Sequence, residues 1–277
     1  MLVTLKEILK IAEEKKIAIG AFNTPNFTSV RAVIAAAEEL RQPVILMHAQ
    51  VHEDMGICKM EEMTPVMRAF AQGAGVPVCV HLDHGTSLDY IRRGIDLGFT
   101  SVMYDGSALP LAENISNTIT AISYAGKTGA SVEAEVGSMG TAEGGGEGDP
   151  SIYTDPAMAE EFVKRTGVDA LACAFGTVHG FYKSAPKLDF QRLSMVRERT
   201  GVPVVMHGGS GVSHDDYRRV IQCGVRKINY YTYMSKAGAA AVSGKEYAQF
   251  HDVLLDAERA MRADVIAAIS VFSGLNA

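Results

Sequence analysis

Eight short apolar runs, rich in β-branched residues, alternate with amphipathic helical patterns along the whole chain, and this alternation constrains the fold most. Strands joined by helices run parallel and are covered by those helices. No linker interrupts the alternation. Eight such units predict a single α/β domain over residues 1–277, a (β/α)8 TIM barrel. The predicted strands are 17–23, 43–49, 76–84, 101–106, 131–137, 170–176, 202–208 and 227–232.

The segments between the strands carry helix signals. Apolar residues recur at helical spacing over 27–40 and 88–97, and a cap followed by a first-turn proline introduces a helix over 157–166. A doubly wound sheet is the alternative. It usually carries a glycine fingerprint after its first strand, whereas this chain has Phe22-Asn-Thr-Pro25 there. The pattern therefore favours the barrel.

Composition limits the kinds of binding partner and the cellular compartment that we expect for this protein. The net charge is −6 and no basic patch stands out, which disfavours nucleic acid as a ligand. No apolar run reaches the length of a membrane span, and the N-terminus carries a helix-capping pattern at Thr4 rather than a signal region. The four cysteines form no C-x-x-C pair, as in a reduced protein. We expect a cytoplasmic protein that binds neither nucleic acid nor membranes.

Polar side chains gather where the predicted strands end. The clearest case is 76–85, an apolar strand that ends in His81, Asp83 and His84. A core does not need three such groups, and burying them unpaired is costly. Active sites of barrels lie at the carboxyl ends of the strands, so these residues predict an active site. Polar residues at the other strand ends are Asn23, His48, Asp105, Glu133, Glu135, His179, His207 and Asn229.

Three of the histidines are candidate metal ligands. His84, His179 and His207 follow the third, sixth and seventh strands, and three neutral imidazoles with an open position are typical of catalytic zinc. The chain has no local H-x-x-x-H pair, so structural histidines remain an alternative at this point. His81 shares a strand side with Asp83 and is interpreted as orienting it.

Loops after the last strands have the features of a phosphate site. The glycine-rich segment 206–212 precedes a helix, and exposed backbone N–H groups and a helix N-terminus favour an anion. Residues Asn229 to Thr232 are expected to complete the cradle, and Gly180 and Lys183 to close it. The alternative is that the glycines only permit a tight turn.

The sequence allows two interpretations for each of two further loops. The glycine-rich segment 137–150 suits a lid, whose acidic residues are either solvated or include a base delivered on closure. The loop after the second strand holds His48, Gln50 and His52, which either reach the pocket or face solvent.

Five motifs occur in an order that is similar to one family over nearly the whole chain. The motifs are His81-Leu-Asp-His-Gly85, Val102-Met-Tyr-Asp-Gly-Ser107, Val132-Glu-Ala-Glu-Val-Gly137, Gly176-Thr-Val-His-Gly180 and His207-Gly-Gly-Ser210. Together they resemble the class II, metal-dependent fructose-bisphosphate and tagatose-bisphosphate aldolases. The resemblance implies a TIM barrel, usually a homodimer or homotetramer, with zinc or a similar divalent ion. It also implies a sugar-phosphate substrate and a place in carbohydrate metabolism such as glycolysis.

The resemblance also implies roles for individual residues. Asp83 is the acid/base at the hydroxyl next to the bond that is cleaved, and Glu143 exchanges a proton with dihydroxyacetone phosphate. Two carboxylates are needed because the two proton transfers involve different atoms. We expect no lysine inside a strand near the site, so Schiff-base chemistry is not expected. The implied catalytic metal ligands are His84, His179 and His207, with Asp105 and Glu135 for a second or displaced metal.

The phosphate of the same three-carbon unit has implied contacts too. A monovalent cation, Na⁺ or K⁺, often assists there in the family. Asn23 and Lys183 are added to the substrate contacts from their positions at strand ends. The contacts implied by the resemblance are Gly180, Gly208, Ser210, Asn229 and Thr232.

The aldehyde side departs from the family. Tyr233 stands where an acidic residue is expected, the segment 250–256 lacks the arginine that many relatives carry, and the second-strand loop lacks their serine. We hypothesise that the aldehyde is unphosphorylated or carries another anionic group, contacted by His48, Gln50, His52 or a tyrosine of 230–233. A bisphosphate substrate stays an alternative, because Arg259 or Arg262 of the C-terminal helix could contact the second phosphate.

Two other functions compete with the aldolase. A metal-dependent sugar-phosphate isomerase or epimerase also begins with an enediolate, but it conserves the carbon skeleton. A sugar-phosphate sensor on the same barrel binds without turnover, and it does not need the carboxylate pair of Asp83 and Glu143.

Overall fold

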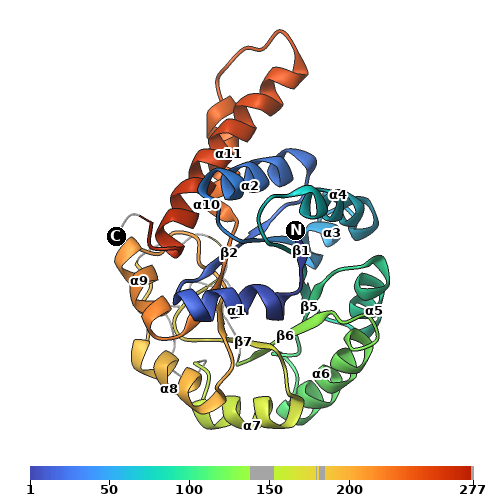
Figure 1. The fold of residues 1–277 in the computed structure, drawn as a ribbon, viewed down its shortest axis with the longest axis vertical. Coiled ribbons are helices and arrows are strands. Elements are labelled where there is room, and N and C mark those ends of the chain that lie inside the picture. The colour runs from blue at the N-terminus through green and yellow to red at the C-terminus, as the bar shows by residue number, and fades with distance from the viewer. Residues whose placement is uncertain (138–152, 179, 181–184, 276–277) are drawn as a thin grey trace.

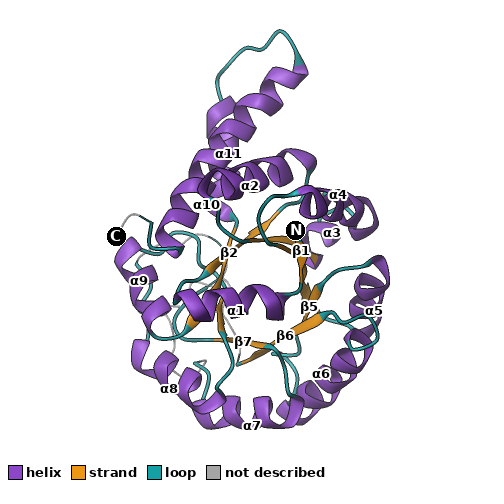
Figure 2. Cartoon of the chain, viewed as in Figure 1, coloured by secondary structure: helices purple, strands orange, loops and turns teal. Residues whose placement is uncertain are grey.

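In the computed structural model, eight parallel strands close into a barrel with helices around it (Figures 1 and 2), which confirms the predicted TIM barrel. The structure describes residues 1–137, 153–178, 180 and 185–275. Each strand pairs with its neighbour along the chain, and β9 pairs with β2 to complete the ring. The barrel strands are β2 (Ile19–Asn23), β3 (Val44–Ala49), β4 (Val78–Gly85), β5 (Ser101–Tyr104), β6 (Ser131–Val136), β7 (Ala170–Cys173), β8 (Val204–Met206) and β9 (Val225–Tyr230).

Helices follow the strands and cover the outside of the barrel. The interface between strands and helices forms the larger apolar core. In Figure 1, α10 and α11 extend beyond the ring as a pair of packed helices. The helices are α1 (Leu5–Lys15), α2 (Phe27–Leu40), α3 (Gln50–Asp54), α4 (Met60–Gly73), α5 (Leu88–Leu97), α6 (Leu111–Ala125), α7 (Pro156–Thr166), α8 (Phe190–Thr200), α9 (His214–Gln222), α10 (Thr232–Val242) and α11 (Phe250–Phe272).

The barrel is closed at its amino end by α1. The Thr4 hydroxyl accepts a hydrogen bond from the Glu7 amide and completes a capping box, as the sequence predicted. The buried face of α1, with Leu5 and Ile8, packs against the apolar interior of the barrel, and Figure 1 shows α1 lying across the ring. The opposite end, where the strands terminate, is left for the site.

A ninth strand, β1 (Leu2–Val3), was not predicted. It pairs with the first residues of β4, at Val78 and Cys79, which β5 does not reach because its pairing with β4 begins at His81. A strand of two residues is too short to show a hydrophobic period, so the sequence pattern could not reveal it.

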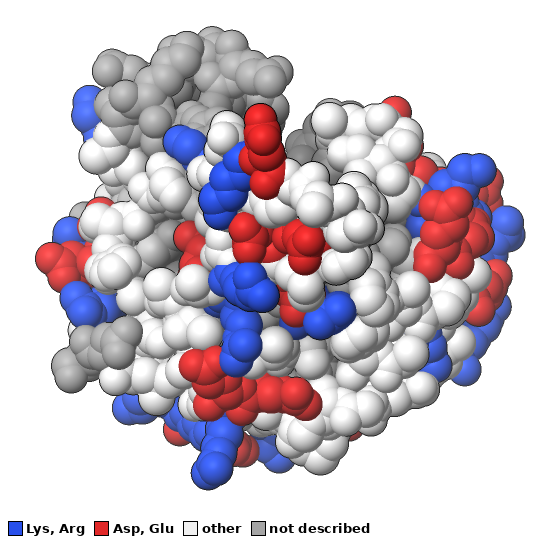
Figure 3. Space-filling view, turned by 90° about the horizontal axis from the view of Figure 1, so that it is seen from above, with Lys and Arg blue, Asp and Glu red and all other residues white. Residues whose placement is uncertain are grey.

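The surface carries charges of both signs (Figure 3). On the face shown in Figure 3, basic and acidic side chains lie interspersed. Within the described ranges, no helix combines the length and the apolar character that crossing a membrane requires. Cys58, Cys79 and Cys173 are buried free cysteines.

Candidate active site

The end of β4 departs from regular strand geometry, and this places two neighbouring side chains in one pocket. Consecutive side chains of a strand normally point to opposite faces. Here the pairing of β4 with β5 shifts register between Leu82 and Gly85, and His84 has φ of 103°. Residues other than glycine rarely adopt such a φ, and strain of this kind persists where the surroundings enforce it. As a result, Asp83 and His84 both line a pocket of about 510 Å³.

His207 lies beside His84, although the two are 123 positions apart in sequence. It is fully buried and is not among the described residues that line the pocket. The ring centroids of the two histidines are 4.5 Å apart. The Nε2 atom of His207 lies 2.9 Å from Oε1 of Glu133. Because a carboxylate only accepts, Nε2 carries the proton and Nδ1 presents a lone pair. Asp83, His84 and His207 therefore offer ligand atoms that all lie within 4.8 Å of one another.

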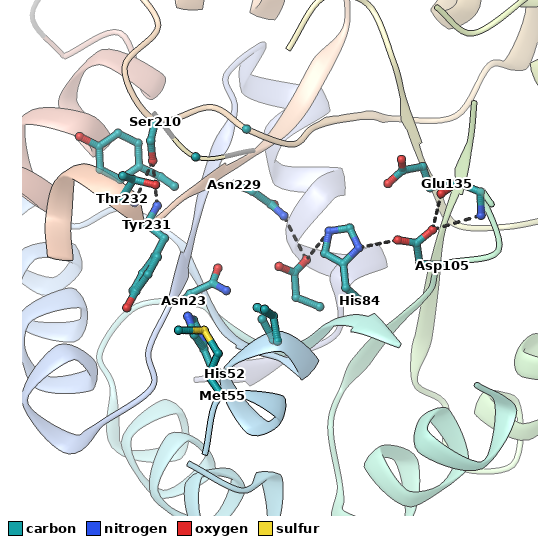
Figure 4. Close-up of a pocket in the computed structure, with 17 residues that line it drawn as sticks. Asn23, His52, Met55, His84, Asp105, Glu135, Ser210, Asn229, Tyr231 and Thr232 are labelled. Atoms are coloured by element: carbon teal, nitrogen blue, oxygen red, sulfur yellow. Dashed lines mark hydrogen bonds and ion pairs between the residues drawn. The ribbon is translucent and has the colours of Figure 1, made fainter. Parts of the chain in front are cut away.

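Asp105 flanks His84 on the side away from Asn229 (Figure 4). The Nδ1–H of His84 donates to Oδ2 of Asp105 at 2.8 Å, and Oδ1 of Asp105 accepts from the Ser107 amide and hydroxyl. His84, Asp105 and Glu135 form a second set of potential ligands. Ser107 lines the pocket but was not predicted as a site residue.

Crowding of the carboxylates changes the protonation of this cluster. Burial lowers the pKa of His84, but the carboxylates of Asp83, Asp105 and Glu135 outweigh it and raise that pKa to about 9. Burial, followed by the charge of Asp105, raises the pKa of Glu135 to about 8. Burial raises the pKa of Asp105, but the hydrogen bond from His84 outweighs it and lowers that pKa overall. A cation placed among these groups would relieve the repulsion.

The donor set fits a divalent metal ion. Imidazole nitrogens and carboxylate oxygens are the ligands that zinc and similar ions take in catalytic sites. Oε2 of Glu135 is buried, and within the described residues it has no hydrogen-bond partner. Such an atom is costly in a folded protein unless a ligand satisfies it. His84 and His207, with Asp83, Asp105 and Glu135 around them, are the described residues that would hold the ion.

Asp83 is positioned by Asn229 of β9. The Nδ2 group of Asn229 donates to Oδ1 of Asp83 at 3.0 Å, whereas His81 Nε2 lies 4.0 Å from the same oxygen. His81 instead hydrogen-bonds through Nδ1 to Ser101 at 2.8 Å. The hydrogen bond that orients Asp83 thus comes from Asn229 and not, as interpreted from the sequence, from His81.

The loops after β8 and β9 are joined by hydrogen bonds. The Ser210 hydroxyl accepts from the amides of Tyr231 and Thr232 at 3.0 and 3.1 Å, where α10 begins. Gly208 has φ of 62°, and a Cβ there would collide with the backbone of Val178, so this position requires glycine. The structure brings the following predicted substrate contacts to the pocket: Asn23, Gly180, Gly208, Ser210, Asn229 and Thr232.

Two predicted contacts are not brought to the pocket. The alternation of β3 points His48 outward, where its Nε2 lies 3.3 Å from the Tyr90 hydroxyl and 3.5 Å from Glu53. Gln50 begins the short helix α3, and its side-chain oxygen accepts from the Thr86 amide. Neither is among the described residues that line the pocket; Val51, His52 and Met55 of the same segment are. The predicted sites at His179, Glu143 and Lys183 lie outside the described residues.

The expectation that no lysine lies inside a strand near the site is wrong. Lys227 belongs to β9 and is fully buried, with its Nζ 2.8 Å from Oε2 of Glu133. It is not among the described residues that line the pocket. Strand alternation contained the signal, because Lys227 is two residues before the inward-facing Asn229 and so shares its side.

The raised pKa values predict how metal binding depends on pH. The pKa of Glu135 rises from an ordinary 4.5 to about 8, and that of His84 from 6.5 to about 9. Between the ordinary and the raised pKa of each group, the folded metal-free protein holds a proton on that group that the unfolded chain has lost, so the contribution of these two groups to stability falls as pH rises from 5 to 9. A metal needs both groups deprotonated. We expect the increase in Tm caused by Zn²⁺ to be larger at pH 8 than at pH 6, measured by differential scanning fluorimetry; an equal or smaller increase at pH 8 contradicts the assignment.

Comparisons with known proteins agree with this geometry. The model of the family described as fructose-bisphosphate aldolase class-II matches residues 3–276. A fructose-bisphosphate aldolase of Geobacillus stearothermophilus is 43% identical over 244 residues, covering 87% of this chain and 84% of that protein. The crystal structure of the YdjI aldolase from Escherichia coli K12 superposes with a TM-score of 0.89 at 36% identity, covering 98% of this chain and 97% of that one. A putative fructose-1,6-bisphosphate aldolase structure from Coccidioides immitis gives a TM-score of 0.87 at 28% identity, with 97% and 95% coverage. The chain therefore belongs to the class II fructose-bisphosphate aldolase family and is an aldolase, a lyase enzyme.

Proposed function

We propose that this aldolase reversibly cleaves a ketose 1-phosphate or 1,6-bisphosphate to dihydroxyacetone phosphate and an aldehyde, and that it uses zinc or a similar divalent ion. The observation that supports this most is the grouping of Asp83, His84 and His207, whose ligand atoms lie within 4.8 Å of one another. Asp83 and His84 line the pocket at the carboxyl end of the barrel. A divalent ion bound there would act as a Lewis acid on a carbonyl oxygen of the sugar phosphate.

The residues of the chain would carry the proton transfers. Asp83 is 4% exposed and accepts a hydrogen bond from Asn229, so its carboxylate is held in one orientation toward the pocket. We assign it the removal of the hydroxyl proton as the carbon–carbon bond breaks. Glu143 is proposed as the second acid/base and His179 as the third metal ligand, from their motifs in the sequence.

The phosphate is proposed to bind at the joined loops after β8 and β9. Gly208, Ser210 and Thr232 line the pocket next to the N-terminus of α10, whose backbone dipole favours an anion. Lys183 and a monovalent cation, Na⁺ or K⁺, would add positive charge. We also propose that residues 1–277 form one domain, that it assembles into a homodimer or homotetramer, and that it acts in the cytoplasm, as the family resemblance implies.

The test of this function is product release from a panel of ketose 1-phosphates and 1,6-bisphosphates. Zinc-loaded protein is expected to release dihydroxyacetone phosphate, detected by a coupled dehydrogenase, and a chelator is expected to stop the release. Formation of an isomeric sugar phosphate without a shorter product would instead indicate an isomerase or epimerase.

The part of the pocket wall that follows β3 supports an altered aldehyde side. It is lined by Ala49, Val51 and Met55, which offer no charge to a second phosphate. The C-terminal arginines are engaged elsewhere, since Arg259 pairs with Asp256 and Arg262 with Glu39. No lysine or arginine occurs among the described residues that line the pocket. We therefore propose that the aldehyde is unphosphorylated; another anionic group, the second possibility drawn from the sequence, would need a cation that these lining residues do not supply.

Polar contacts to such an aldehyde have two candidates, His52 next to this wall and Tyr231 of the loop after β9. The rings of His52 and Tyr231 meet edge to face with centroids 4.8 Å apart, and both residues line the pocket. Burial, followed by the neighbouring His48, lowers the pKa of His52. His52 would therefore be neutral near pH 7 and offer a hydrogen bond rather than a charge.

A gain-of-function change tests the aldehyde side. Met55→Arg places a guanidinium on the apolar wall and is expected to raise kcat/KM for fructose 1,6-bisphosphate about 10-fold, because a hydrogen bond to a charged group contributes about 1.5–3 kcal/mol. Met55→Leu is the matched control and should leave the substrate preference unchanged. If the wild-type protein already turns over the bisphosphate much faster than ketose 1-phosphates, the proposed aldehyde preference is wrong.

A further inference from the structure

A layer of buried polar side chains lies inside the barrel, directly beneath the pocket. His81, Glu133 and Lys227 are each 0% exposed, and none is among the described residues that line the pocket. The Nζ of Lys227 lies 2.8 Å from Oε2 of Glu133 and 3.3 Å from Nε2 of His81. The other oxygen of Glu133 accepts from His207 Nε2 at 2.9 Å. One carboxylate thus connects a buried lysine to a candidate metal ligand.

Stability alone is a weak explanation for this layer. Removing two charges from water costs several kcal/mol per ion, and a buried ion pair often stabilises a fold no better than apolar residues of the same size. Many other interior residues, such as Ile45, Cys79 and Ala172, are apolar. The buried lysine–glutamate pair lies next to His207, which points to a role in the site above it.

The geometry shows what the lysine does. Two donors hold the Glu133 carboxylate, Lys227 on one oxygen and His207 on the other, so the carboxylate has little freedom to turn. Because Oε1 of Glu133 accepts from Nε2–H of His207, the opposite nitrogen, Nδ1, keeps its lone pair and faces Glu135 at 3.4 Å. His81, held by Ser101, meets the Lys227 ammonium from a second side.

We propose that Lys227 is a positioning residue of the metal centre: through Glu133, its ammonium group fixes the ring orientation and the tautomer of His207, so that Nδ1 is presented to a divalent cation. This inference rests on the proposed function, because it assigns His207 as a metal ligand. Outer groups of this kind typically change metal affinity 10–100-fold when they are removed.

The experiment measures metal affinity and does not depend on turnover. Lys227→Met removes the ammonium and keeps the length of the side chain. Arg226→Met is the matched control, since Arg226 precedes Lys227 on β9, is 8% exposed and pairs with Glu13 on the outside of the barrel at 2.9 Å. Zn²⁺ affinity is measured by competition with a chromophoric chelator, and Co²⁺ absorption reports the geometry of the bound ion.

We expect Lys227→Met to bind Zn²⁺ about 10–100-fold more weakly and to change the Co²⁺ spectrum, while Arg226→Met matches wild type in both. Glu133→Gln combined with Lys227→Met removes the unpaired buried charge and keeps an acceptor for His207, so it should recover part of the affinity. A folded Lys227→Met protein with unchanged affinity and spectrum overturns the inference.

Two remaining outcomes are distinguishable. If Lys227→Met does not fold, the double variant is compared with wild type directly, and unchanged affinity in it again overturns the role of Lys227. If wild-type protein itself binds neither Zn²⁺ nor Co²⁺, the metal-dependent function proposed above fails, and this inference fails with it.

Discussion

Replacing Asp83 by asparagine is expected to lower kcat about 10²–10⁴-fold, the range that loss of a general acid/base group produces, while metal affinity changes little. The amide oxygen still accepts the hydrogen bond that Asn229 donates at 3.0 Å, so the geometry is kept and only the basicity is lost. The measurement is steady-state release of dihydroxyacetone phosphate from the best ketose phosphate, together with the Zn²⁺ competition assay.

A control separates this effect from a general loss of charge. Asp169 directly precedes β7, at the end of the barrel away from the pocket, and its Oδ2 accepts from the Val132 amide at 2.9 Å. Asp169→Asn should retain the kcat of wild type. An Asp83→Asn enzyme with full activity would remove the proton-transfer role assigned to Asp83.

Replacing His207 by alanine is expected to weaken Zn²⁺ binding by more than the roughly 100-fold that outer groups contribute, and to lower kcat about 10³-fold or more. The buried Glu133 then loses the hydrogen bond at 2.9 Å and keeps only Lys227 as a close donor among the described residues. Zinc content after dialysis and turnover of the same ketose phosphate are the measurements. His214→Ala is the control, because His214 is exposed at the start of α9; a His207→Ala protein that retains one tightly bound zinc would contradict the ligand assignment.

The order of strands and helices was predictable because hydrophobic periodicity and helix capping depend only on residues that are close in sequence. The helices over 27–40 and 88–97 occur with the predicted bounds, and the barrel follows from eight alternating units. Five strands, β5 to β9, end earlier than predicted, for instance at Cys173 and Met206, before glycines with positive φ such as Gly176 and Gly208 in the loops that follow. The period of the apolar run does not encode where such a loop begins.

The main source of error within the site was the side of the strand or loop to which each side chain points. Simple alternation cannot predict that Asp83 and His84 point into the same pocket, because this depends on a register shift against β5. The outward position of His48 follows from alternation once Met47 is known to face the interior core, but that facing was visible only in the closed barrel. His52 reaches the pocket because 50–54 forms a helix, which the sequence interpretation treated as a loop.

Contacts between residues far apart in sequence could not be predicted, for a different reason. Lys227 and Glu133 lie 94 residues apart and meet at 2.8 Å only because β6 and β9 face each other across the barrel interior. Burying an unpaired lysine in that position would cost much free energy of folding, so the lysine needs a partner with opposite charge. No local sequence pattern identifies that partner. Motif order named Asp83, His84 and His207, which the barrel brings together, whereas the polar layer next to them could be found only from the fold.

The most direct test of a metal-dependent aldolase needs no knowledge of the aldehyde. Dihydroxyacetone phosphate alone is incubated with zinc-loaded protein in D₂O, and loss of a hydroxymethylene proton is followed by NMR. We expect one of the two protons on the carbon that forms the new bond to exchange, and a chelator to suppress this exchange. The Asp83→Asn substitution should leave the exchange unchanged, although it strongly lowers the rate of cleavage. Absence of exchange in the metal-loaded protein, or exchange that a chelator leaves unchanged, would contradict the proposed function.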